Sequence, residues 1–329
     1  MKKNKLKVLF LSKHSRIGSN IIRGKTVAKQ LSLMGLVTSN ITYKIFKILR
    51  AYYLHKYDVF VFIKRIDLEL AKLLKENGKV VVIDTVDNYE FESGPLWSEE
   101  NTYVDYYIAN TKVHKEFLHK QFSIPNENIF IIEHHHSNLF NVTKEVKSIK
   151  TIGFIGEKQQ FKKSDKLISL LQKRKLDFYM PEKSPTTNED AVAETLKLDC
   201  FILNLNKDLD KTQNNLIEYM IKFKPAQKIL LPFSIGIPTI LTPYVSYIEA
   251  IESAGYSKEE FLFASNEDEL IAKIDKLLNF DPEELKSLIK KQKKVASLFK
   301  IENIAKKYIK MLDTIYIRYS NKELLEMNL

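Results

Sequence analysis

Short apolar runs alternate along this chain with longer segments in which apolar residues recur at helical spacing. The short runs are continuously apolar, as in the strands of a parallel sheet that is covered on both faces. In the first part of the chain the predicted strands are 7–11, 59–63, 80–83, 106–108 and 129–132. The predicted helices between them are 21–33, 68–76 and 111–121. This alternation predicts a doubly wound α/β domain.

A second alternation begins after the polar, lysine-rich segment 141–150. Its predicted strands are 151–155, 177–180, 200–203, 238–241 and 261–263. Its predicted helices are 165–174, 214–222, 226–235, 247–254 and 268–278, and the chain is helical after 281. The fold class is therefore α/β, with two Rossmann-like doubly wound domains in tandem and a helical C-terminus. The domains are 1–145, 146–300 and a helical segment, 301–329, that could pack back on the first domain. The carboxyl ends of both sheets would face a shared cleft, where ligands bind in such folds.

Composition supports a globular protein of two domains. The chain has 329 residues, of which 44% are hydrophobic and 28% are charged. Its single cysteine, Cys200, excludes a disulfide framework and indicates a reducing compartment. The apolar run after the basic N-terminus is too short for a signal peptide, and no run is long enough to span a membrane. We expect a cytoplasmic protein.

The net charge of +11 favours polyanionic ligands such as nucleic acid, anionic lipid or phosphorylated substrates. No nucleic-acid reader motif is present, so nucleic acid is not an expected partner. Two basic amphipathic segments, 41–57 and 286–310, suit an anionic membrane surface. The first places Ile41, Ile45, Ile48, Leu49 and Tyr52 on one predicted helical face. Core-facing helices with solvated lysines would show the same pattern, so peripheral attachment to the inner face of the cell membrane is one of two interpretations.

The segment 223–240 is the most informative part of the sequence. It predicts a helix that is opened by Pro225, ended by Gly236 and followed by a strand that begins at Pro238. Lys224 and Lys228 flank the helix N-terminus, where free amides, the helix dipole and two ammonium groups would favour an anion. An ordinary αβ unit would show the same sequence pattern, so the pattern alone does not decide between an anion-binding site and a purely structural unit.

A lysine-bearing loop, a helix and Gly-x-Pro-x-Ile resemble the sugar-nucleotide-binding region of GT-B glycosyltransferases. The order of elements, the mid-chain linker and the helical C-terminus fit the same resemblance over nearly the whole chain. It implies that Lys224 and Lys228 bind the phosphates of a nucleotide-sugar donor and that no metal or other cofactor is needed. Many retaining members carry two glutamates here, the first near Phe223 and the second at the position of Leu231. Their absence leaves the ribose contact and the stereochemical class open.

The loop after the first strand, 12–24, resembles the acceptor-side first loop of the same family. It is not a Gly-x-Gly-x-x-Gly turn, so a dinucleotide cofactor is not expected. His14 could take a proton from the acceptor hydroxyl, since an imidazole titrates near neutral pH, or it could be a solvated loop residue. Arg16 in the same loop is a candidate substrate contact.

Three acidic residues follow the predicted strand 80–83. Asp87 is the preferred general base or sugar-binding carboxylate, and Glu90 is a candidate substrate contact. Asp84 itself is expected to cap the following turn.

Three consecutive histidines, His134, His135 and His136, follow the last strand of the first domain. Neighbours on an extended chain point to opposite faces, so we favour contact with substrate or phosphate over a zinc site. In the second domain, the turn after strand 151–155 carries Gly156 and Lys158, and the resemblance places this turn near the donor phosphates.

The predicted function is transfer of a sugar from a nucleotide-sugar to a glycan or glycolipid acceptor in bacterial surface polysaccharide synthesis. Three alternatives remain: a sugar-nucleotide epimerase of the same fold, a non-catalytic subunit of this fold, and a non-catalytic protein that binds nucleic acid or glycan.

Overall fold

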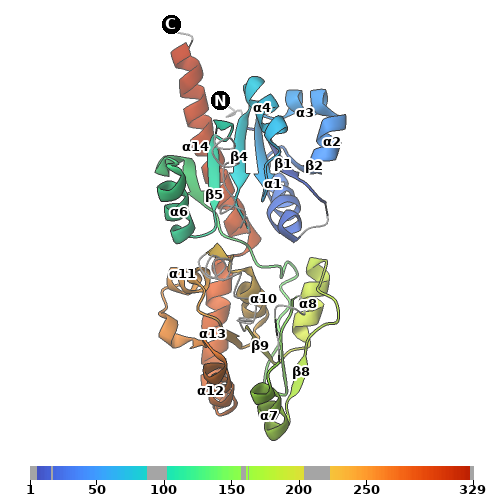
Figure 1. Cartoon of the computed structure of the whole chain (residues 1–329), viewed down its shortest axis with the longest axis vertical. Coiled ribbons are helices and arrows are strands. Elements are labelled where there is room, and N and C mark those ends of the chain that lie inside the picture. Colours follow the sequence, from blue (N-terminus) through green and yellow to red (C-terminus); the bar gives the residue numbers. More distant parts are fainter. Residues whose placement is uncertain are drawn as a thin grey trace. The chain divides into compact units, whose positions relative to one another are not determined.

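The computed structural model describes residues 6–15, 18–86, 102–156, 161, 163–203 and 223–326, with side chains up to 319. Its contacts divide the chain into two compact units. The first unit is Met1–His134 together with Ile301–Leu329, and the second is His135–Lys300. The division falls between His134 and His135, earlier in the chain than the predicted linker. Each unit is built on one parallel sheet with helices around it (Figure 1).

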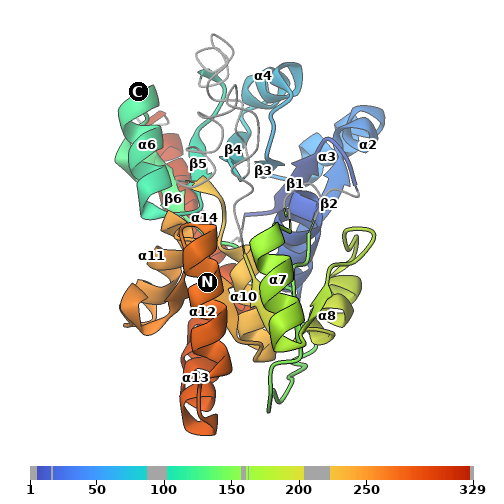
Figure 2. The same cartoon turned by 60° about the horizontal axis from the view of Figure 1, so that its bottom comes forward.

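The first unit contains a six-stranded parallel sheet. Its strands, in order across the sheet, are β2 (Thr38–Thr42), β1 (Val8–Ser12), β3 (Val59–Ile63), β4 (Val80–Asp84), β5 (Tyr106–Ala109) and β6 (Ile129–Ile131). The helices are η1 (Asn20–Thr26), α1 (Val27–Leu33), α2 (Tyr43–Ile48), α3 (Arg50–Lys56), α4 (Leu68–Glu76), α6 (Lys112–Phe122), a short η3 (Asn126–Asn128) and α14 (Ile301–Glu326). Helices α2 and α3 lie at the β2 end of the sheet and α6 at the β6 end (Figures 1 and 2). The core is centred on β1, β3 and β4, whose residues are all buried.

The second unit contains a five-stranded parallel sheet. Across the sheet the strands are β11 (Leu262–Phe263), β10 (Thr239–Leu241), β9 (Cys200–Ile202), β7 (Thr151–Gly153) and β8 (Asp177–Tyr179). The helices are α7 (Asp165–Arg174), α8 (Asn188–Leu196), α10 (Gln227–Ile235), α11 (Val245–Ser253), a short η6 (Lys258–Glu260), α12 (Glu267–Leu278) and α13 (Pro282–Leu298). Helix α13 packs against α10 and α11.

Each sheet reverses its direction of winding beside its own first strand. In the first unit the chain moves from β1 to β2 on one side and then returns to β3 on the other side of β1. In the second unit β7, β8 and β9 repeat the same order. The loops that leave neighbouring strands diverge at such a switch point, and this opens a crevice at the carboxyl ends of the strands. The residues that follow β1 and β7 therefore occupy the positions where ligands bind in doubly wound sheets.

The helix ends explain why the sequence pattern located these elements well. Asp67, Ser164 and Asn266 each accept a hydrogen bond from a backbone amide in the first turn of α4, α7 and α12, respectively. Helix α10 ends at Gly236, which adopts the left-handed conformation with φ of 96°. Pro238 then leads into β10, so the predicted helix, glycine stop and strand are all confirmed.

Four parts of the sequence prediction need correction. Residues 41–57 are not one helix: 41 and 42 belong to β2, and α2 and α3 are separate helices that meet at Leu49. Strand β2 was missed because its sequence, TSNIT, is mostly polar and its residues are only half-buried. Helix α8 was also missed, and the predicted helix at 21–33 begins as a π-helix, η1. The predicted helix 214–222 lies outside the described residues.

In the described part of the chain, no helix combines the length and the apolarity needed to cross a bilayer.

Candidate functional site

His14 lies two residues beyond the carboxyl end of β1, at the switch point of the first sheet. Its side chain is exposed, and the Ser12 hydroxyl donates a hydrogen bond to the His14 carbonyl oxygen (3.2 Å). This turn presents an imidazole to solvent where a doubly wound sheet binds its ligand. The other predicted residues of this unit's site, Arg16, Asp87 and Glu90, lie outside the described residues.

Asp84, the last residue of β4, belongs to a fully buried polar cluster that sequence analysis missed. One of its oxygens accepts hydrogen bonds from Arg23 Nε (2.6 Å) and from the Tyr308 hydroxyl (3.1 Å). Arg23 Nη1 also donates to the Glu133 carbonyl oxygen (2.6 Å). The predicted capping role is present but secondary, because the other Asp84 oxygen accepts from the Val86 amide at 3.3 Å.

Burial and the charge of Asp84 shift the pKa values of the other two members of this cluster. Burial lowers the pKa of Arg23, but Asp84, with smaller contributions from Tyr308 and Glu133, raises it by more, so this pKa lies above its ordinary value. Burial and Asp84 raise the pKa of the Tyr308 hydroxyl well above its ordinary value. Arg23 is therefore a cation and Tyr308 a neutral hydrogen-bond donor. The cluster joins η1, β4 and α14, and it places the end of β4 and the start of the helix after the first loop in fixed positions.

The three consecutive histidines are buried. His135 Nδ1 is 2.7 Å from the carbonyl oxygen of His136, and the His136 amide donates to the Phe299 carbonyl oxygen (3.1 Å). Burial lowers the pKa of His136 to about 4, helped by His135 and Lys300. Such residues expose little surface to a ligand, so the structure does not favour the predicted contact with substrate for His134, His135 or His136.

Two buried histidines should make stability depend on pH. Burial lowers the pKa of His114 to about 3, and that of His136 is about 4. In the unfolded chain both would titrate near 6.5, so that state takes up protons that the folded state excludes. The free energy of unfolding is expected to fall as the pH drops from about 6.5 towards 4. Each of the two histidines contributes a fall of up to about 1.4 kcal/mol for each pH unit.

Urea unfolding of the wild type and of His114→Gln at a series of pH values checks this expectation. The variant should lose the share of the pH dependence that His114 contributes, while carboxylates contribute equally to both proteins. Parallel curves for the two proteins below pH 6.5 would show that His114 does not resist protonation.

In the second unit, Gly156 and Lys228 lie side by side at the switch point. Gly156 follows β7, and Lys228 is in the first turn of α10. Lys228 Nζ is 4.7 Å from the centroid of the Phe154 ring. A Cβ placed on Gly156 would lie 3.0 Å from Lys228 Nζ and 2.6 Å from the Phe154 ring. Two predicted donor-site residues, 72 positions apart in sequence, are thus in contact distance of each other.

Lys224 and the start of α10 complete the described part of this site. Lys224 Nζ is 5.6 Å from the centroid of the Tyr244 ring. Burial raises the pKa of Tyr244 to about 12, so this ring remains a neutral phenol. The N-cap residue of α10 is Ala226, which offers no side-chain oxygen to the amides of the first turn. Lys158, the remaining predicted residue, lies outside the described residues.

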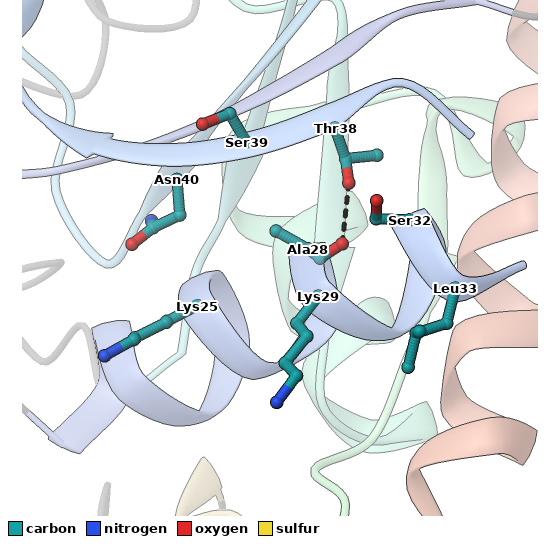
Figure 3. Close-up of a pocket in the computed structure, with 8 residues that line it drawn as sticks. All are labelled: Lys25, Ala28, Lys29, Ser32, Leu33, Thr38, Ser39 and Asn40. Carbon is teal, nitrogen blue, oxygen red and sulfur yellow. Dashed lines mark hydrogen bonds between the residues drawn. The ribbon is translucent and has the colours of Figure 1, made fainter. Parts of the chain in front are cut away.

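An open pocket of about 340 Å³ lies between the first helical segment and the edge strand β2 (Figure 3). Lys25, Lys29 and Ser32 line it from the helical side, and Thr38 and Asn40 line it from β2. The Thr38 hydroxyl donates to the Ala28 carbonyl oxygen (2.6 Å), which holds the strand to the helix. The pocket contains none of the predicted site residues. In the described ranges, no three His, Cys, Asp or Glu side chains are grouped to hold a metal ion.

Comparison with known proteins identifies the fold through structure rather than sequence. No protein-family profile and no curated protein sequence matches the chain. It is similar to the crystal structure of Alr3699/HepE from Anabaena in complex with UDP-glucose, with a TM-score of 0.59 and 11% identity over 94% of this chain and 100% of that one. It is also similar to a glycosyltransferase from Rickettsia africae, with a TM-score of 0.61 and 13% identity over 95% and 99% of the two chains.

A third similar structure is the N-terminal domain of trehalose-6-phosphate phosphatase from Candida albicans. Its TM-score is 0.60, with 10% identity over 95% of this chain and 98% of that one. At these identities the likeness concerns the fold, and one fold serves several activities. The chain has the two-sheet α/β fold of GT-B glycosyltransferases.

Proposed function

We propose that this protein transfers a sugar from a nucleotide-sugar donor to a glycan or lipid-linked acceptor in bacterial surface polysaccharide synthesis. The observation that carries the proposal is the convergence of Gly156 and Lys228 at the switch point of the second sheet. The solved structure of HepE with UDP-glucose, which has a similar fold, supports a nucleotide-sugar as the donor.

The donor site would act mainly on the diphosphate. The Lys228 ammonium would neutralise charge that develops on the leaving group, and the first-turn amides of α10 would donate to its oxygens. Gly156 would let the backbone approach the phosphates, because a side chain there would collide with Phe154 and Lys228. Lys224 would add a second positive charge at the same helix end.

The acceptor side would lie on the first unit. Deprotonation of the acceptor hydroxyl needs a base, and His14 stands at the switch point of that sheet. Asp87 is the alternative base, three residues after the end of β4. The buried Arg23–Asp84–Tyr308 cluster would hold these two loops in position without contacting substrate.

The acceptor class suggests where the protein works. Lipid-linked acceptors of surface polysaccharides are carried by membranes, so we place the protein at the inner face of the cell membrane as a peripheral protein. The net charge of +11 supports attraction to anionic lipid. The chemistry as proposed needs no metal, since lysine and helix amides supply the charge at the leaving group.

A thermal-shift screen against UDP-, GDP-, CMP- and dTDP-sugars tests the donor class. We expect one of these nucleotides to stabilise the protein, because a ligand at 100 times its Kd adds about 2.7 kcal/mol to the free energy of unfolding. Duplex DNA and RNA serve as polyanionic controls. Stabilisation by nucleic acid alone would contradict the proposal and favour a nucleic-acid-binding protein.

A further inference from the structure

Helices α2 and α3 carry apolar residues on two sides. On the inner side, the Phe46 ring makes an edge contact with Phe60 (5.8 Å between centroids), and the Tyr43 ring lies 5.7 Å from Phe62. These contacts attach α2 to the sheet, and the Phe46 ring stacks on Tyr53 of α3 (5.9 Å between centroids). An amphipathic helix attached in this way normally presents polar residues to solvent on its other side.

The solvent side of this helix pair carries apolar side chains as well as charged ones. The exposed large apolar side chains there, with their exposed fractions, are Ile45 (42%), Ile48 (71%), Leu49 (47%) and Tyr52 (53%). Ile45 and Ile48 lie on α2, Leu49 joins the two helices and Tyr52 lies on α3, so the other three are all within four residues of Leu49. Isolated exposed apolar residues are ordinary, but a contiguous group marks a surface that another phase or molecule covers.

The charged side chains within residues 41–57 are all positive, and the nearby carboxylate of Asp67 pairs with Lys47. Lys44 and Arg50 are exposed, Lys47 is exposed beside Asp67, and Lys56 donates a hydrogen bond to the Tyr52 hydroxyl (2.6 Å). Residues 41–57 contain no Asp or Glu. A second copy of the chain would bring the same positive charges face to face, which opposes a symmetric dimer through this surface. An anionic lipid surface satisfies both the charges and the apolar residues.

We propose that α2 and α3 form a membrane-docking surface, in which Ile45, Ile48, Leu49 and Tyr52 enter the interface of an anionic bilayer and Lys44 and Arg50 contact lipid phosphates. The inference deepens the membrane location in the proposed function. It concerns a different part of the chain from the donor site, and vesicle binding needs neither donor nor acceptor.

Vesicle flotation of the full chain tests the proposal at low salt. One set of vesicles is pure phosphatidylcholine, and the other contains about one-third phosphatidylglycerol. The wild type should float with the anionic vesicles and much less with the neutral ones, and high salt should weaken the binding. Ile48→Asp should lower the partition coefficient by at least about tenfold, because it replaces an apolar side chain that would enter the bilayer with a negative charge.

Matched substitutions elsewhere on the protein show whether the loss of vesicle binding is specific to α2 and α3 or follows from any change of charge or apolar surface. Ile317→Asp makes the same change at another exposed isoleucine (57%), on α14. Lys44→Gln/Arg50→Gln should lower binding by on the order of tenfold. Lys120→Gln/Lys147→Gln, which removes two exposed positive charges elsewhere, and Ile317→Asp should both stay within about twofold of the wild type.

Three results would overturn the proposal: equal flotation with neutral and anionic vesicles, normal flotation of Ile48→Asp, or a solution dimer that Ile48→Asp dissociates. The last result, seen by light scattering, would assign the surface to a second copy. Nucleotide-sugar binding measured on the same samples distinguishes failure of this surface from failure of the proposed function. Because Ile48 is exposed, its substitution should leave the thermal midpoint unchanged.

Discussion

Loss of the catalytic base is expected to lower kcat by about 10²–10⁴-fold while leaving donor affinity intact. His14→Ala and Asp87→Asn are the two variants to compare. If the enzyme inverts configuration, one of them should show this loss, because that residue accepts the proton of the acceptor hydroxyl. If it retains configuration, the donor phosphate would assist instead, and both substitutions would act mainly on KM.

Steady-state kinetics with calorimetry of donor binding separates these cases. Ser15→Ala, in the same loop as His14, is a suitable control because its hydroxyl cannot act as a base of this strength. Near-normal kcat and KM in both His14→Ala and Asp87→Asn would place the acceptor base elsewhere and contradict the assignment of both loops.

Replacing Asp84 with alanine is expected to lower the free energy of unfolding by about 3–5 kcal/mol. The substitution would leave the Arg23 guanidinium buried with no carboxylate beside it, and it would remove the acceptor of the Tyr308 hydroxyl. Tyr308→Phe, which removes one hydrogen bond and retains the ring, should cost only about 1 kcal/mol.

Urea denaturation monitored by circular dichroism measures these effects. Asp268→Ala is the matched control, because the ion pair between Lys166 and Asp268 is exposed and its loss should change stability little. Arg23→Met/Asp84→Leu should be less destabilised than Asp84→Ala, since no unpaired charge remains buried. If the destabilisation of Arg23→Met/Asp84→Leu equals the sum of those of Arg23→Met and Asp84→Leu, the two side chains are not coupled.

Most of the fold could be predicted because its signals are local. The strands β1, β3 and β4 are continuous apolar runs, and capping residues such as Asp67 mark the helix starts. Strand β2 shows the limit of this reasoning. It is held by parallel pairing to β1 and by the hydrogen bond from Thr38 to the Ala28 carbonyl oxygen, and its polar sequence carries no strand signal.

The candidate site was predictable to different degrees in the two units. Gly156 and Lys228 each have a local signal, a glycine turn after a strand and a lysine at a helix start, and the sheet order brings them together. The Arg23–Asp84–Tyr308 cluster has no such signal, because its members are 61 and 224 residues apart in sequence. The three consecutive histidines are conspicuous in the sequence, but the sequence does not show that all three side chains are buried.

In the proposed function, the donor diphosphate binds beside Gly156 and Lys228. Titration calorimetry of the stabilising nucleotide-sugar against Lys228→Ala tests it most directly, with Lys173→Ala on α7 as the control. We expect Lys228→Ala to lose about 1.5–3 kcal/mol in binding free energy, which is the range for a charge-assisted hydrogen bond. The control should bind the nucleotide-sugar as tightly as the wild type. Unchanged nucleotide affinity in a folded Lys228→Ala protein would contradict this assignment.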